Sequence, residues 1–261
     1  MELSINGLNT SVTDTGAGDR GTVLFLNGWA TRTARYRRVF DLLSALGYRV
    51  VGFDAPGVGG TEEPREPMTL EDYAAFALAV CHRLELREAI LFGHSHGGRT
   101  ALLMLEDEHS PLKCPRAVLM DSAGIRNPPT GKQKVVQGAY KAVKFLGTSQ
   151  LTAPLFGDLY EEWRGKRASA DYKAASPVMR QTLQHILGRD LRAGMGRITA
   201  ETLLLWGDRD EDTPLSYGQE MERLIPGAGL AVIKDAGHFC FEDNWPQFEA
   251  VLRAFFAPQS N

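Results

Sequence analysis

The sequence is poor in cysteine, and its few cysteines are far apart. Cys81, Cys114 and Cys240 are the only three in 261 residues, and no CxxC motif occurs. A disulfide framework needs more cysteines at closer spacing and an oxidising compartment. We therefore expect reduced thiols and a cytoplasmic protein.

Long apolar runs and a strong charge of either sign are also absent. No hydrophobic stretch approaches the length that spans a bilayer, and the first residues, MELSING, lack the pattern of a signal peptide. The net charge is only −3, which gives no reason to expect nucleic acid or a membrane surface as a partner. We expect a soluble protein that acts on a small molecule, in an oligomeric state that the sequence leaves open.

Motifs for a cofactor or a metal are missing as well. The glycine-rich stretch DAPGVGG at 54–60 lacks the Lys-Ser/Thr of a phosphate-binding P-loop and is typical of a turn. The sequence has no internal repeat and no metal-binding cluster. We expect neither a cofactor nor a metal.

Short apolar runs alternate with amphipathic helical patterns along most of the chain. Buried strands are predicted at 23–26, 50–53, 89–92, 117–120, 202–206 and 230–233. Residues 2–14 predict a hairpin, and the capping-box pattern from Thr69 to Asp72 predicts the start of a helix. Strands that alternate with helices favour an α/β fold with a mostly parallel sheet and helices on both faces.

The alternation stops between residues 126 and 197. This block has helical patches separated by Pro, Gly and Ser, and it holds 13 Lys or Arg against 5 Asp or Glu. Its net charge is therefore +8, and the rest of the chain carries −11. We interpret residues 126–197 as a helical cap inserted between two parts of one core, 1–125 and 198–261.

The charge of this block suggests a hypothesis about specificity. Arg164, Arg180 and Arg189 lie beside apolar residues in helical patches, so they are candidates to face an anionic substrate. The alternative is that the basic residues form a solvated face or complement the acidic core.

The stretch LFGHSHGGR at 91–99 predicts the centre of the site. An apolar strand runs into Gly-x-Ser-x-Gly and then into a strong helix former, which is the layout of a nucleophile elbow. The glycines suit such a sharp turn because a chain without Cβ atoms allows backbone and helix to approach closely. The alternative is an ordinary serine in a tight turn. Ser95 is the candidate nucleophile.

A serine hydroxyl needs a base to take its proton and a third group to orient that base. Candidates for both roles follow other predicted strands: Asp121, the run from Asp208 to Asp212, and His238. Sites in parallel sheets lie beyond the carboxyl ends of the strands, so we expect these side chains to meet Ser95. The order Ser, Asp, His is the one associated with the elbow.

These motifs together resemble the α/β-hydrolase superfamily, over nearly all of the chain apart from 126–197. The quoted motifs are NGW at 27–29, FDAPGVGG at 53–60, GHSHG at 93–97, WGDRDEDTP at 206–214 and AGHFCFEDN at 236–244. Within the superfamily the chain is similar to capped hydrolases, which include carboxylesterases, carbon–carbon bond hydrolases and cofactor-free perhydrolases. The resemblance implies a mostly parallel eight-stranded sheet with an inserted helical cap.

The resemblance also implies roles for residues. Ser95 is then the nucleophile, His238 the base and Asp210 the acid, because Gly-x-x-Asp with a Pro four residues later selects Asp210. Asp121 remains an alternative, since some members carry the acid after the preceding strand. Backbone N–H groups of His96 and Trp29 are expected to form the oxyanion hole.

The chain departs from the family at one point, where Asn27 replaces the usual histidine before Gly28. We expect this change to be tolerated because the catalytic donor in this loop is a backbone group. The side chain of Trp29 is expected to form a wall of the acyl pocket or to pack in the core. We interpret His94 as structural.

Three functions are compatible with these residues. The first is a serine hydrolase that cleaves a small ester or related acyl substrate through an acyl-enzyme. The second is a carbon–carbon bond hydrolase of diketone-type substrates that uses the same triad. The third is a ligand receptor without catalysis, which an intact triad disfavours. The substrate-binding residues are not identifiable from the sequence.

Overall fold

The computed structural model describes residues 1–126 and 175–257. The strands are β1 (Glu2–Ile5), β2 (Leu8–Asp14), β3 (Thr22–Leu26), β4 (Arg49–Phe53), β5 (Ile90–His94), β6 (Arg116–Met120), β7 (Glu201–Gly207) and β8 (Gly229–Ile233). The helices are η1 (Thr33–Tyr36), α1 (Arg37–Ala45), α2 (Leu70–Arg83), α3 (His96–Leu105), α7 (Pro177–Leu187), α8 (Arg192–Met195), α9 (Leu215–Leu224), α10 (Cys240–Asp243) and α11 (Trp245–Phe255). Most of the predicted cap therefore lies outside the described residues, and its boundaries stay a prediction.

The strands form one sheet in the order β1-β2-β4-β3-β5-β6-β7-β8. The β1–β2 and β2–β4 pairs are antiparallel, and every pair from β4 to β8 is parallel. The predicted eight-stranded, mostly parallel sheet is confirmed. The β1–β2 hairpin turns at Asn6 and Gly7, both with positive φ, as a two-residue turn requires.

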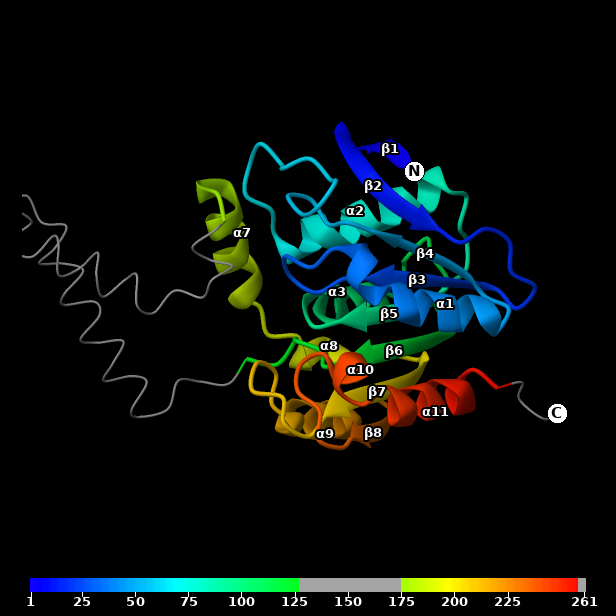
Figure 1. Ribbon diagram of the computed structural model, residues 1–261. Helices are drawn as coiled ribbons and strands as arrows, with labels where there is room; N and C mark the ends of the chain where they lie inside the picture. Colours follow the sequence, from blue (N-terminus) through cyan, green and yellow to red (C-terminus); the bar gives the residue numbers. More distant parts are fainter. Residues whose placement is uncertain (127–174, 258–261) are drawn as a thin grey trace, which may run out of the picture.

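Both faces of the sheet carry apolar side chains, and helices bury them on each side. Along β3, Val23 and Phe25 join one core cluster, whereas Leu24 and Leu26 join the other, as the alternation of side chains in a strand dictates. Helices α1 and α11 cover the first face, and α2, α3 and α9 cover the second (Figure 1). This explains why the strands appear in the sequence as continuous apolar runs.

The capping box predicted at the start of α2 is present. The Asp72 N–H donates to Thr69 Oγ1 at 3.2 Å, and the Thr69 N–H donates to Asp72 Oδ2 at 2.7 Å. These two bonds satisfy donors that a helix start leaves free. The local sequence is therefore sufficient to place this helix.

Helix α7 lies beyond the carboxyl ends of the parallel strands (Figure 1). It is held against the loop before α2, because Thr182 Oγ1 accepts a hydrogen bond from the Met68 N–H at 3.0 Å. The Met179 side chain also fills the space beside Gly57, where a Cβ would lie 2.6 Å from the Met179 sulfur. The end of the sheet where the site is expected is therefore covered by α7.

Candidate active site

Ser95 occupies the junction between β5 and α3 in a backbone conformation that residues other than glycine rarely adopt. Its φ is 52° and its ψ is −112°. The backbone holds it there: the Ser95 N–H donates to the Met120 carbonyl, and the Ser95 carbonyl accepts from the Ala123 N–H, each at 3.0 Å. Such a constrained serine is typical of functional sites, where the surrounding structure maintains the strain.

The glycines of the elbow are required by close contacts rather than by flexibility. A Cβ on Gly97 would lie 1.9 Å from the Leu26 carbonyl oxygen, and one on Gly93 would lie 2.5 Å from the Gly97 carbonyl oxygen. Helix α3 can therefore start directly beside the ends of β3 and β5 only because these residues lack side chains.

Replacing Gly97 by alanine is expected to lower the free energy of unfolding by at least about 3 kcal/mol, because the new methyl group meets backbone that cannot move away. Thermal and urea unfolding would measure the loss. Gly196→Ala is the matched control, since nothing lies within 4 Å of a Cβ there. Equal stability of the two variants would contradict the packing argument.

The structure brings Ser95, His238 and Asp210 together. His238 Nε2 lies 2.9 Å from Ser95 Oγ, and His238 Nδ1 lies 2.8 Å from Asp210 Oδ2. The three residues follow β5, β8 and β7, as the rule on strand ends predicts. With a proton on Nδ1 bonded to Asp210, Nε2 is free to accept the serine proton, so the arrangement is able to activate a hydroxyl nucleophile.

Asp210 is held by the loop that follows it. Its Oδ1 accepts hydrogen bonds from the N–H groups of Asp212 at 2.8 Å and Thr213 at 2.9 Å, and Thr213 Oγ1 lies 2.7 Å from its Oδ2. The Asp210 side chain is fully buried, and that of His238 is 14% exposed. The carboxylate is thus fixed in place and has the hydrogen-bond donors that a buried charge needs.

The same contacts govern the protonation of the pair. Burial by itself would raise the pKa of Asp210, but the hydrogen bond and charge of His238 outweigh it, so that pKa lies below its ordinary value. Burial likewise would lower the pKa of His238, but the hydrogen bond and charge of Asp210 raise it above 6.5. Asp210 therefore stabilises the charged form of the imidazole.

Asp121, the alternative acid, lies in a different position. Its Oδ1 accepts a hydrogen bond from the Gly207 N–H at 2.8 Å, and no hydrogen bond joins it to His238 among the described residues. Burial raises the pKa of Asp121 to about 7. Asp210, rather than Asp121, contacts the imidazole in this structure.

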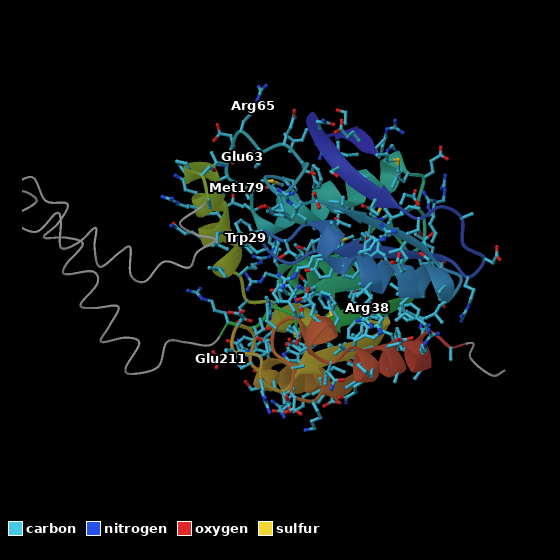
Figure 2. The ribbon with its side chains drawn as sticks, viewed as in Figure 1. Trp29, Arg38, Glu63, Arg65, Met179 and Glu211 are labelled. Atoms are coloured by element: carbon cyan, nitrogen blue, oxygen red, sulfur yellow. The ribbon has the colours of Figure 1, made fainter. Side chains whose placement is uncertain are left out.

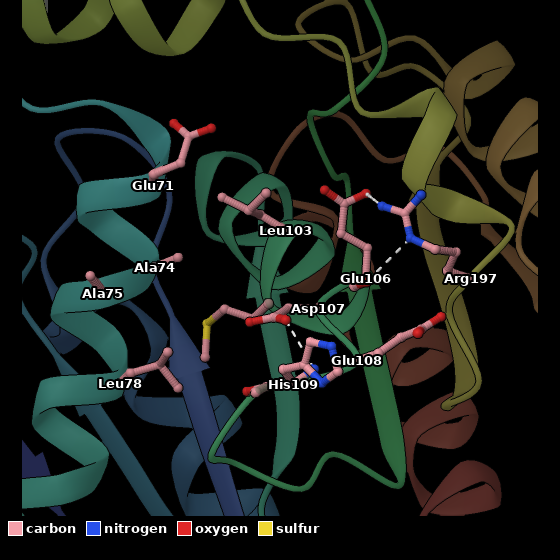
Figure 3. A pocket seen from close by; sticks show the side chains of 12 residues that line it. Glu71, Ala74, Ala75, Leu78, Leu103, Glu106, Asp107, Glu108, His109 and Arg197 are labelled. Atoms are coloured by element: carbon pink, nitrogen blue, oxygen red, sulfur yellow. Dashed lines mark hydrogen bonds and ion pairs between the residues drawn. The ribbon is translucent and has the colours of Figure 1, made fainter.

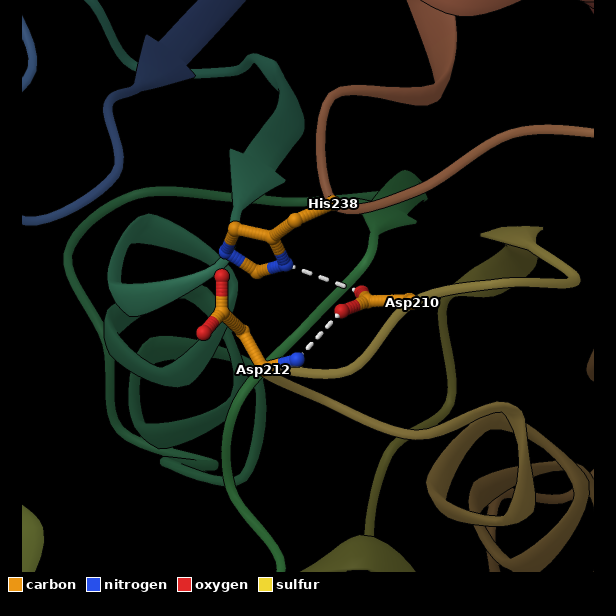
Figure 4. A group of neighbouring side chains, drawn as sticks. All are labelled: Asp210, Asp212 and His238. Atoms are coloured by element: carbon orange, nitrogen blue, oxygen red, sulfur yellow. Dashed lines mark hydrogen bonds and ion pairs between the residues drawn. The ribbon is translucent and has the colours of Figure 1, made fainter.

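Asp210, Asp212 and His238 also lie close enough together to be considered as metal ligands. One atom from each lies within 4.8 Å of the others (Figure 4). However, His238 Nδ1 already bonds to Asp210 Oδ2, and the Asp212 N–H bonds to Asp210 Oδ1. An ion at this point would have to break the imidazole–carboxylate bond. We interpret the group as a hydrogen-bonded pair with an acidic neighbour.

His94, the last residue of β5, connects Tyr36 of η1 to the loop that carries His238. Its Nε2 lies 2.7 Å from the His238 carbonyl oxygen, so this nitrogen is the donor, and its Nδ1 accepts from the Tyr36 hydroxyl at 2.7 Å. Tyr36 in turn accepts from the Gly28 N–H at 3.2 Å. Burial lowers the pKa of His94 to about 3, which keeps the ring neutral. This agrees with its interpretation as a structural residue.

Both predicted oxyanion-hole residues line the same cavity as Ser95. His96 is the first residue of α3, and Trp29 follows β3. Asn27, where the family has histidine, donates from Nδ2 to the Phe53 carbonyl at 2.9 Å and to Thr33 Oγ1 at 2.8 Å. These bonds tie the start of the loop that carries Trp29 to the end of β4 and to η1.

A cavity of about 610 Å³ opens beside Ser95. Residues of β5, α3 and the loops after β3, β7 and β8 line it, together with Leu183, Ile186 and Leu187 of α7. Trp29 is part of this lining, and its ring lies edge-on to the His96 ring at 5.8 Å. Trp29 lies on the side of the molecule that carries α7 and its residue Met179 (Figure 2). The cavity is large enough for a small organic substrate.

A second cavity, of about 510 Å³, lies between α2 and the end of α3 (Figure 3). Its charged side chains include Glu106 and Arg197, which form an ion pair at 3.3 Å, and Glu71, which pairs with Arg189. Neither Ser95 nor His238 lines it. We therefore place the candidate site at the cavity beside Ser95.

A family model for the α/β-hydrolase fold matches residues 21–244. The chain belongs to the α/β-hydrolase family. A 2-hydroxymuconate semialdehyde hydrolase from a Pseudomonas species is 28% identical, with 98% of this chain and 93% of that protein covered. The similar solved structures include an esterase from Exiguobacterium antarcticum (TM-score 0.73, 23% identity, 98% of both chains). A meta-cleavage product hydrolase from Pseudomonas fluorescens has a TM-score of 0.72 at 21% identity, with 100% of this chain and 98% of that one covered.

Membership of the family confirms the predicted fold and the expectation that this α/β-hydrolase is an enzyme. Cys81, Cys114 and Cys240 are free thiols, as expected. Within 1–126 and 175–257, none of the helices combines the length and the apolar character needed to cross a bilayer. Which bond this α/β-hydrolase cleaves is a separate question.

The three arginines singled out in the predicted cap give the specificity hypothesis little support. Arg189 pairs with Glu71 at 2.8 Å, and neither Arg189 nor Arg180 lines the cavity beside Ser95. Arg164 lies outside the described residues. A buried arginine that does line this cavity is Arg99, on α3.

The sequence analysis missed three residues of the site. Tyr36 and Thr213 act through hydrogen bonds to distant segments, Tyr36 to His94 and Thr213 to the Asp121 carbonyl. Arg99 is buried beside the cavity. Arg99 is the only one with a usable clue, because it stands one helical turn after Ser95 and so shares its face of α3.

Proposed function

We propose that this protein is a serine hydrolase that cleaves a small ester or related acyl compound through an acyl-enzyme. The observation that carries the proposal is the chain of hydrogen bonds from Ser95 through His238 to Asp210, at 2.9 and 2.8 Å, beside a cavity. Residues 126–197 are proposed as its cap, and a cytoplasmic location stays a prediction from the cysteines.

The proposed reaction begins when Ser95 Oγ attacks the acyl carbon and its proton passes to His238 Nε2. Asp210 stabilises the resulting imidazolium. The oxyanion accepts hydrogen bonds from the backbone N–H groups of His96 and Trp29. His238 then gives the proton to the leaving alcohol, and the acyl group stays on Ser95.

The second half returns the enzyme to its starting state. Water attacks the acyl carbon and gives a proton to His238, which passes it to Ser95 Oγ as the bond to the acyl group breaks. The products are one acid and one alcohol. Neither a metal nor a redox group is part of this route.

Labelling with a fluorophosphonate, followed by turnover of p-nitrophenyl esters of increasing chain length, tests the proposal. We expect stoichiometric labelling of Ser95 and preference for short acyl chains, because a cavity of about 610 Å³ suits a small substrate. A protein that is neither labelled nor active on any ester of the series would support the receptor alternative and contradict the proposal.

Carbon–carbon bond cleavage is the second candidate, because several relatives carry names of this kind. One 26% identical protein from a Pseudomonas species is a 2-hydroxy-6-oxononadienedioate/2-hydroxy-6-oxononatrienedioate hydrolase. Release of an acid and a ketone from a diketone, faster than any ester is hydrolysed, would favour this candidate over ester hydrolysis.

The acid limb of the pH profile of kcat/KM is expected to have its midpoint above pH 6.5. His238 must be neutral to accept the serine proton, and its pKa is raised above 6.5, so activity is lost as the pH falls through that raised pKa. Initial rates between about pH 5 and pH 9 would show the limb. Asp210→Asn removes the hydrogen-bonded charge that raises this pKa and should move the limb to lower pH. A midpoint at or below 6.5 in the unmutated enzyme would contradict the assignment of His238.

A further inference from the structure

Arg99 is a buried cation inside the candidate site. It lies on α3, four residues and about one helical turn after Ser95, so the two side chains start from the same face of the helix. Only 6% of Arg99 is exposed, and it lines the same cavity as Ser95 and His238.

No carboxylate among residues 1–126 and 175–257 pairs with the guanidinium of Arg99. Nη1 donates to the Ile186 carbonyl of α7 at 2.5 Å, and Nε has no hydrogen-bond partner. Asp190, whose charge acts on Arg99, forms an ion pair with Arg192 instead. Burial lowers the pKa of Arg99 to about 10, so the group stays charged at neutral pH. A buried charge without a counter-charge is costly. Nε is fully buried, whereas Nη2, for which no hydrogen bond to a described residue is found, is left to bind an anion.

The other arginines of the cavity differ from Arg99. Arg35 forms a two-point ion pair with Glu242. Arg126 is exposed, and it donates to the Gly188 carbonyl at 3.0 Å. Among the described residues that line the cavity, Arg99 is thus the one buried arginine without a carboxylate partner.

The His96 side chain adds a second donor without a partner. It lines the same cavity, is 6% exposed, and neither ring nitrogen has a hydrogen bond. Burial and, after it, the charge of Arg99 lower its pKa to about 3, so the ring is neutral and carries one N–H. Two buried side chains of α3 that line the cavity therefore have polar atoms without a partner in the described part of the chain, which native proteins seldom leave without a reason.

We propose that Arg99, assisted by His96, binds a carboxylate on the acyl part of the substrate, so that the preferred substrates are monoesters of short dicarboxylic acids. The inference rests on the proposed hydrolase function and adds the substrate class. A carboxylate fits because a guanidinium is the cation whose N–H groups match carboxylate oxygens best. The alternative is that Arg99 only ties α7 to α3 through Ile186.

A matched pair of esters separates these two roles. We would measure kcat/KM for p-nitrophenyl hydrogen adipate and for its neutral methyl ester, p-nitrophenyl methyl adipate. The unmutated enzyme should prefer the acid. Arg99→Gln should lower the ratio of acid to neutral ester by about 10- to 100-fold, the value of a lost hydrogen bond to a charged group. Arg99→Lys keeps the charge but not the planar guanidinium, so its ratio should lie between those of the unmutated enzyme and of Arg99→Gln.

Arg189→Gln is the control, because it removes the same charge from a residue that does not line the cavity. Its ratio should stay close to that of the unmutated enzyme. If Arg99→Gln lowers kcat/KM for both esters by the same factor, Arg99 only connects α3 to α7 and the proposal is wrong. Preference of the unmutated enzyme for the neutral ester would also overturn it, and that result does not depend on any variant folding.

Binding without turnover separates this proposal from the proposed function. Monomethyl adipate should bind to Ser95→Ala protein at least about tenfold more tightly than to Ser95→Ala/Arg99→Gln protein in calorimetry. Equal affinities would overturn the carboxylate site even if the enzyme hydrolyses esters. Absence of fluorophosphonate labelling together with Arg99-dependent binding would instead contradict the hydrolase and leave the carboxylate site supported.

Discussion

Replacing Ser95 by alanine is expected to lower ester turnover by on the order of a millionfold, because loss of the nucleophile removes the chemistry that the whole triad shares. The same variant should no longer react with a fluorophosphonate. The small side chain fits the elbow, so the melting temperature should change little. Rates with p-nitrophenyl esters, intact-protein mass after labelling and thermal unfolding would measure the three effects.

Ser44→Ala is the matched control for this experiment. Ser44 lies on α1, away from the cavity, and its hydroxyl has no hydrogen-bond partner, so its removal should leave both labelling and turnover intact. If Ser95→Ala retains ester hydrolysis through an acyl-enzyme, Ser95 is not the nucleophile.

Replacing Asp210 by asparagine is expected to lower kcat by about four orders of magnitude. Asparagine has nearly the same shape, but its amide can turn an N–H group toward Nδ1 and so favour the wrong tautomer of the imidazole. It also lacks the negative charge that stabilises the imidazolium during the reaction. The effect depends on the 2.8 Å contact between Asp210 Oδ2 and His238 Nδ1. Single-turnover and steady-state rates of the purified variant would measure it.

Asp121→Asn provides the comparison, since it makes the same chemical change after the neighbouring strand. Its loss should be less than about tenfold, because an asparagine oxygen can still accept the hydrogen bond from the Gly207 N–H. A larger loss at Asp121 than at Asp210 would move the acid to the end of β6.

Local sequence patterns were sufficient for the sheet, the elbow and the candidate residues. Apolar runs predicted strands buried on both faces, and GHSHG placed Ser95 between β5 and α3. The rule that sites gather at the carboxyl ends of parallel strands then brought Asp210 and His238 into the same list. These inferences succeed because they depend on periodicity, turn chemistry and strand order, which neighbouring residues determine.

The family spacing favoured Asp210 over Asp121, but only the tertiary structure showed that Asp210 contacts His238, because that contact depends on which carboxylate reaches an imidazole on another loop. It alone linked His94 to Tyr36, 58 residues away in the chain, and to the carbonyl of His238, 144 residues away. It also showed that Arg99 lines the cavity, whereas Arg180 and Arg189 do not, so Arg99 became the candidate that binds an anion. No pattern in the sequence reveals whether an arginine has a carboxylate beside it, since a counter-charge is a property of packing and not of spacing.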